Sequence, residues 1–126
     1  MKYEHGRISK ADDSAYVGED YLVHGTAKFW VTHNMGGATF DSLNMSSKTD
    51  NGTGDTTFTF ASVMDNANYN QAGITEESVV SPHMGTGNTG ANITTAFTRN
   101  RVTLHTSSSG YDAELVCFSI LGDLAA

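Results

Sequence analysis

The sequence predicts an all-β protein, a single antiparallel β-sandwich preceded by an extended N-terminal arm, and three observations favour this fold. Gly, Thr, Ser and Asn supply 50 of the 126 residues, a composition that is typical of strands and turns and poor in helix formers. Several short runs alternate apolar with polar residues. Dense turn signals separate these runs. The length fits one domain, which we divide into an arm, residues 1–24, and a β-sandwich, residues 25–126.

The arm differs in composition from the rest of the chain. It holds eight of the 21 charged residues, and its apolar residues follow neither a helical nor a strand period. Such a segment cannot bury enough apolar surface to fold alone, so we expect it to lie along another surface. Scattered tyrosines are common anchors at interfaces. The expected contact residues toward another chain are Tyr3, Arg7, Ile8, Tyr16 and Tyr21.

The first strands of the sandwich lead into a hairpin. Residues 28–32 are aromatic and β-branched, and residues 43–46 alternate apolar with polar. Residues 50–55 read Asp-Asn-Gly-Thr-Gly-Asp, a turn signal in which Asn and Gly can adopt positive φ at low cost. Residues 56–61 then alternate with period two, which places their two phenylalanines on one face. The predicted structural turn residues are Asn51, Gly52 and Gly54.

The middle of the chain predicts further strands around one long loop. Residues 76–90 interrupt the strand pattern with a proline and a run of Gly, Thr and Asn. Long loops often carry recognition on all-β scaffolds. Strands are expected at residues 69–74, 94–98 and 102–106, with a turn at residues 107–110.

The last strand, residues 113–121, is nearly continuous in apolar residues. A strand that is apolar on both faces is usually buried on both. One face is therefore expected to meet another subunit or the arm. We assign the trimer interface to Val116, Phe118 and Ile120, which share one face, while Leu115, Cys117 and Leu121 share the other.

The charge balance disfavours nucleic-acid and membrane partners. The chain carries 14 acidic and 7 basic residues, a net charge of −7, and the basic residues form no dense run. Binding to phosphate groups needs a basic stripe, and no apolar stretch is long enough to span a bilayer. No hydrophobic leader opens the sequence, and the one cysteine cannot form an internal disulfide. We expect synthesis in a reducing cytoplasm.

No residue pattern predicts catalysis, so we expect no enzyme activity, cofactor or metal. The five histidines have no metal-ligand spacing and are expected at the surface or on edge strands. Residues 85–90 lack the Lys-Ser/Thr ending of a phosphate loop, and residues 50–55 lack the ligand spacing of a calcium loop. Cys117 lies in the most apolar strand and is expected to be inert core.

One stretch resembles a pattern that recurs in virion proteins of tailed phages. Residues 42–60 read Ser-Leu-Asn-Met-Ser-Ser-Lys-Thr-Asp-Asn-Gly-Thr-Gly-Asp-Thr-Thr-Phe-Thr-Phe. Residues 64–69, Met-Asp-Asn-Ala-Asn-Tyr, continue the similarity where that family has Met-Pro-Asp-Ala-Asn-Tyr. The resemblance extends over about residues 25–122. It implies a trimeric β-sandwich of the tail-fibre or head-decoration type, a structural or adhesive part of a virion.

Two functions are compatible with this resemblance. The first is a capsid decoration (cement) protein, made in the host cytoplasm, which trimerises on the outer head surface and binds the major capsid protein through the arm. With Met1 taken as the start, only about 24 residues precede the domain, which leaves no room for a fibre shaft. The alternative is the receptor-binding tip of a tail fibre or spike, with residues 76–90 touching a host surface glycan. A polysaccharide-degrading enzyme is a distant third, because it needs a carboxylate-lined groove.

Overall fold

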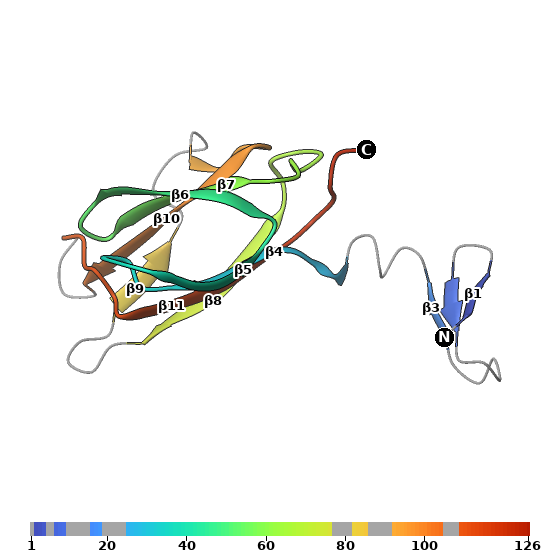
Figure 1. The fold of residues 1–126 in the computed structure, drawn as a ribbon, viewed down its shortest axis with the longest axis horizontal. Helices are drawn as coiled ribbons and strands as arrows, with labels where there is room; N and C mark the ends of the chain where they lie inside the picture. Colours follow the sequence, from blue (N-terminus) through green and yellow to red (C-terminus); the bar gives the residue numbers. More distant parts are fainter. Residues whose placement is uncertain are drawn as a thin grey trace.

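Two antiparallel sheets of four strands each form the domain in the computed structural model (Figure 1). The structure describes residues 25–76, 92–104 and 109–126 fully, and the backbone of the strands β1, β2, β3 and β9. One sheet has the order β5-β4-β11-β8 and the other β6-β7-β10-β9. The first comprises β5 (Thr39–Leu43), β4 (Ala27–His33), β11 (Leu115–Leu121) and β8 (Asn70–Glu76). The second comprises β6 (Met45–Gly52), β7 (Asp55–Phe60), β10 (Phe97–Leu104) and β9 (Pro82–Gly85).

An aromatic core joins the two sheets. The ring of Phe29 on β4 lies 5.2 Å from that of Phe60 and 6.0 Å from that of Phe58, both on β7. Phe58 in turn lies 5.4 Å from Phe118 on β11. Burial alternates with period two along β4, β7, β10 and β11, as expected of strands with one face in a core. The predicted all-β class is confirmed, and so is the shared inward face of Phe58 and Phe60.

The β6–β7 hairpin forms where the sequence predicts it. Gly52 and Gly54 have φ of 117° and 70°, conformations that strongly favour glycine. A Cβ on Gly54 would also collide with the carbonyl oxygen of Val102 and the backbone nitrogen of Tyr111. The prediction of positive φ at Asn51 is wrong, because this residue lies within β6 and does not have positive φ. Its side-chain amide instead donates hydrogen bonds across the hairpin.

Two stretches differ from the sequence prediction. β10 is one continuous strand where two were expected, because its inward positions include the polar Thr98 and Asn100, which hide the apolar alternation. The predicted loop, residues 76–90, contains β9, which pairs with β10. Near the predicted turn, Thr103 forms an antiparallel bridge with Gly110. Residues 107 and 108 lie outside the described residues.

The arm contains three short strands, β1 (Lys2–Glu4), β2 (Arg7–Ser9) and β3 (Tyr16–Gly18). They pair antiparallel in this order, so the backbone folds back on itself here, whereas the composition predicted no regular pairing. The side chains of the expected contact residues lie outside the described residues: Tyr3, Arg7, Ile8, Tyr16 and Tyr21.

Candidate functional site: the outer face of the β5-β4-β11-β8 sheet

The two faces of β11 have different surroundings. Val116, Phe118 and Ile120 point between the sheets and are buried in the core of their own chain. Their assignment to the trimer interface is therefore wrong, because an enclosed side chain cannot contact a second subunit. The opposite face carries Leu115, Cys117, Ser119 and Leu121, which are half-buried. This second face is directed away from the other sheet.

Strand register arranges the outer face of the β5-β4-β11-β8 sheet in rows of neighbours. One row runs across all four strands through Leu43, Trp30, Ser119 and Ala72. The adjacent row runs through Asp41, Thr32, Cys117 and Ile74. Of these eight side chains, Asp41 is the one that carries a charge, and it lies on the edge strand β5. The centre of this outer face is therefore uncharged.

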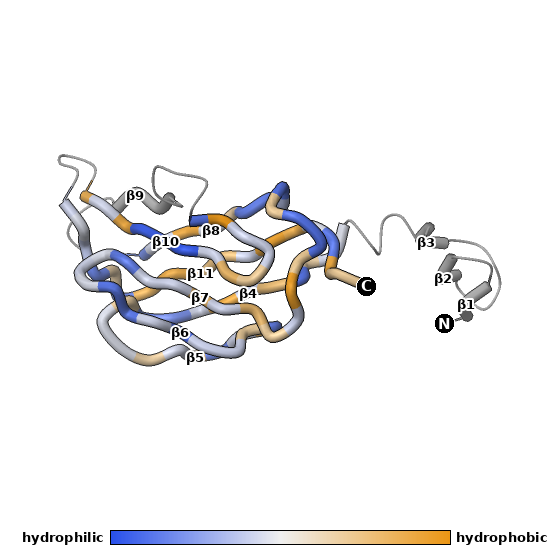
Figure 2. The backbone as a smooth tube through the Cα atoms, turned by 90° about the horizontal axis from the view of Figure 1, so that it is seen from above, coloured by the Kyte–Doolittle hydropathy of each residue, from blue (hydrophilic) through white to orange (hydrophobic). Residues whose placement is uncertain are grey.

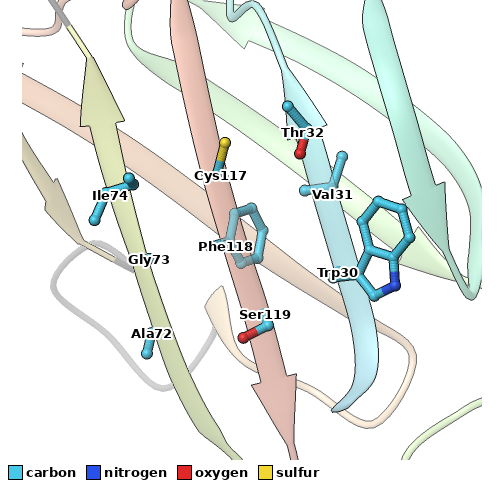
Figure 3. Close-up of a pocket in the computed structure, with 9 residues that line it drawn as sticks. All are labelled: Trp30, Val31, Thr32, Ala72, Gly73, Ile74, Cys117, Phe118 and Ser119. Atoms are coloured by element: carbon cyan, nitrogen blue, oxygen red, sulfur yellow. The ribbon is translucent and has the colours of Figure 1, made fainter.

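A hollow of about 290 Å³ lies in the outer face above β11 (Figure 3). Ala72 and Ser119 have small side chains and Gly73 has none, so the floor is low between Trp30 on β4 and Ile74 on β8. The lining is mainly apolar. Cys117, expected to be inert core, instead contributes its free thiol to the hollow's lining and is half-buried.

Large apolar side chains stand exposed on this sheet. The exposed fractions are 70% for Ile74, 61% for Phe40 and 45% for Leu43. Phe40 lies where the β4–β5 register shifts, since Thr39 pairs with His33 and Asp41 with Thr32. Folded monomers seldom leave several large apolar side chains exposed on one sheet, and large exposed apolar patches mark interaction sites.

The outer face of the β6-β7-β10-β9 sheet is polar by contrast. Asp55 accepts two hydrogen bonds from the guanidinium of Arg99, one of them from Nε at 2.7 Å, and lies 3.7 Å from Nε of Arg101. The hydrogen bonds from Arg99, and one from Asn51, lower the pKa of the Asp55 carboxyl below its usual range. Figure 2 shows hydrophilic colours along β6 and mostly hydrophobic colours along β11.

Sequence reasoning missed this ion cluster. Asp55 and Arg99 are 44 residues apart, and no local pattern joins them. The one available signal was the alternation in β10, which places Arg99 and Arg101 on the same face of a strand. Only the pairing of β7 with β10, which sets Arg101 opposite Asp55, brings the charges together.

Polar side chains are also buried between the sheets. His33 was expected at the surface or on an edge strand, yet it lies on the inner strand β4 and is buried against the ring of Phe58 at 4.8 Å. Burial, and then the nearby Lys48 ammonium, lower the pKa of His33 from 6.5 to about 4, so the ring is neutral at pH 7.

Lys48 Nζ donates hydrogen bonds to the carbonyl oxygens of Asn34 at 2.7 Å and Gly37 at 2.8 Å. It thereby ties β6 to the β4–β5 loop.

Among the residues that the structure describes, no three His, Cys, Asp or Glu side chains converge in a way that could hold a metal ion. Nor does that part of the chain contain a helix with the length and apolar character needed to cross a membrane.

Comparisons of the chain with protein-family models, with curated proteins and with solved structures found no match.

Proposed function

We propose that the chain is a structural protein of a tailed-phage virion, a β-sandwich that assembles as a homotrimer and decorates the outer surface of the capsid. The observation that carries this proposal is the uncharged, mainly apolar centre of the outer face of the β5-β4-β11-β8 sheet. In a chain of net charge −7, the centre of this face is where two copies can approach without bringing like charges together. The resemblance of residues 42–60 to virion proteins supplies the biological setting.

Energetics favour a closed assembly over a simple pair. Full burial of each large exposed side chain stabilises by about 1.5–3 kcal/mol, while association of two copies costs roughly 4–15 kcal/mol of lost freedom. One contact between two copies is therefore weak. A ring of three makes a third contact without a further loss of translational freedom, which supports the trimer.

The positions of the chain ends support attachment through the arm. Ala27 at the start of β4 is the register neighbour of Leu121 at the end of β11. The chain therefore enters and leaves the first sheet at the same end (Figure 1). The β4–β5 loop and the β6–β7 hairpin lie at the other end of their strands. In the proposed decoration protein, the arm extends from the end that faces the capsid, and the hairpins face outward.

Deletion of the arm tests this proposal. A variant without residues 1–20 should keep the β domain, as seen by circular dichroism, but lose attachment to capsids that lack the protein. A matched control replaces the same residues with a Gly/Ser linker of equal length, which should also fail to attach. Wild-type occupancy by the truncated protein would contradict the role of the arm.

Copy number in purified particles distinguishes the two candidate functions. A decoration protein is present in hundreds of copies, whereas a receptor-binding tip is present in a few dozen or fewer. If the full-length protein binds host cells and not capsids, the receptor-binding function replaces decoration.

A further inference from the structure

The outer face of the β5-β4-β11-β8 sheet carries a protrusion and a hollow at different places. Leu43 protrudes from the edge strand β5. The hollow lies over β11 toward the opposite edge strand, β8, between Trp30 and Ile74. The hollow is lined by residues of two adjacent rows of cross-strand neighbours, and Leu43 belongs to the first of these, which runs through Trp30 and Ser119 to Ala72. Across four strands this row spans three inter-strand spacings, roughly 14 Å.

We infer that Leu43 of one copy packs into the hollow of the next copy, a contact that rests on the self-association in the proposed function. A dry cavity of roughly 150 Å³ admits a benzene molecule, so a hollow of about 290 Å³ has room for a leucine side chain. Phe40, which is also exposed on β5, offers a further apolar side chain near the other end of this strand.

The occupant is a second copy of this chain because the face complements itself. The row that contains Leu43 has no charged residue, and neither does the lining of the hollow. Asp41, which begins the adjacent row, lies at the β5 margin. Two acidic chains can therefore join along the Leu43 row while Asp41 stays near solvent. A basic partner would instead need acidic side chains at the centre of the face, and the two central rows hold none there.

In the trimer of the proposed function this contact is head-to-tail, because a two-fold contact, in which each Leu43 fills the other copy's hollow, would stop at a dimer. When two copies join through one Leu43 and one hollow, the first copy keeps an unfilled hollow and the second keeps an unused Leu43. A third copy inserts its own Leu43 into the unfilled hollow and accepts the unused Leu43 in its own hollow, which closes the ring. The trimer then contains three identical Leu43–hollow contacts.

Two variants, each defective on one side of the contact, test this inference. Leu43→Lys removes the protrusion and Ala72→Trp fills the hollow. Both positions are exposed, so the fold should persist, with thermal melting by circular dichroism as the check. Matched controls on the polar face are Thr49→Lys and Ser47→Trp, also at exposed positions. Sedimentation velocity should show a trimer for the wild type and both controls, and monomers for the two variants, with self-association weakened about 100-fold.

An equimolar mixture of the two variants gives the decisive result. The Leu43→Lys copy supplies an intact hollow and the Ala72→Trp copy an intact Leu43, so the mixture has one intact contact and should form a heterodimer that cannot grow. Because a single contact is weak, the mixture and each variant alone are compared over a series up to high protein concentration. A trimeric wild type whose two variants stay trimeric, or whose variant mixture associates no more strongly than either variant alone, would overturn the contact and leave the proposed trimer standing. A wild-type dimer would overturn the head-to-tail ring. A monomeric wild type would overturn the trimer of the proposed function and this contact together.

Discussion

Acidification should destabilise the folded chain through His33. This side chain is buried against Phe58, and burial together with Lys48 lowers its pKa from 6.5 to about 4. Above pH 6.5 the ring is neutral in both the folded and the unfolded chain, so it adds no pH dependence there. Between pH 6.5 and pH 4 the unfolded chain binds a proton that the folded chain does not. The free energy of unfolding should therefore fall as the pH falls through this range.

The expected size of the effect follows from the pKa difference. Each pKa unit corresponds to about 1.4 kcal/mol, so the shift from 6.5 to about 4 lowers the free energy of unfolding by about 3 kcal/mol. A total stability of roughly 5–15 kcal/mol is usual for a domain, so this loss is large. Below pH 4 the contribution of His33 is fully lost and the dependence on this group ends.

Urea unfolding of the wild type and of His33→Phe, at a fixed protein concentration, measures this effect. Phenylalanine keeps a ring against Phe58 and cannot titrate. Trp30 is the single tryptophan and reports unfolding by fluorescence. The other four histidines are the same in both proteins, so the difference between their pH dependences isolates His33. If the wild type and His33→Phe lose equal stability between pH 7 and about pH 4.5, the assignment of a buried neutral histidine is refuted.

Three further predictions concern the hairpin, the ion cluster and the core. Gly54→Ala should lower the free energy of unfolding by at least about 2 kcal/mol, because the new Cβ collides with backbone atoms. Gly52→Ala places its Cβ in open space and should lower the free energy of unfolding by only about 1 kcal/mol, for its positive φ. Equal melting temperatures of the two variants would contradict this ranking. Asp55→Asn should cost about 1 kcal/mol at pH 7 by weakening the pair with Arg99. Because the pair lowers the pKa of Asp55, the difference in the free energy of unfolding between wild type and variant should vanish in acid, where the carboxyl of Asp55 is protonated. A stability difference that persists below that pKa would argue against the ion pair. Val116→Asp should unfold the chain, at a cost of about 3–5 kcal/mol, and a folded monomeric variant would show that this side chain faces outward after all.

Local signals in the sequence predicted much of the fold. The composition, rich in strand and turn residues, predicted the all-β class. The Asp-Asn-Gly-Thr-Gly-Asp run is a turn signal within six neighbouring residues, and the β6–β7 hairpin turns within this run. β10 was predicted as two strands because Asn100 occupies an inward position, and a polar residue there breaks the pattern on which the prediction depends. The propensity signal is weakest where tertiary burial overrides it.

The candidate site was predicted only in part, for a physical reason. Period-two alternation shows that β11 has two apolar faces, but it cannot say which one turns inward. That choice is made by the pairing with β4 and by the facing sheet, whose Phe58 contacts Phe118. The sequence therefore predicted a second apolar face on the strand and assigned the wrong one to the partner. The hollow depends on Ala72 and Gly73 lying beside Ser119, a relation between distant residues that no local pattern contains.

The mass of the full-length chain in solution tests the central claim most directly. One chain has a mass of 13.4 kDa, and native mass spectrometry separates one, two and three copies without ambiguity. The apolar outer face predicts a species of three times the mass of the single chain, which the Leu43→Lys substitution reduces to one copy. A wild-type chain that stays at the mass of one copy at every concentration would contradict the claim that this face joins copies of the chain.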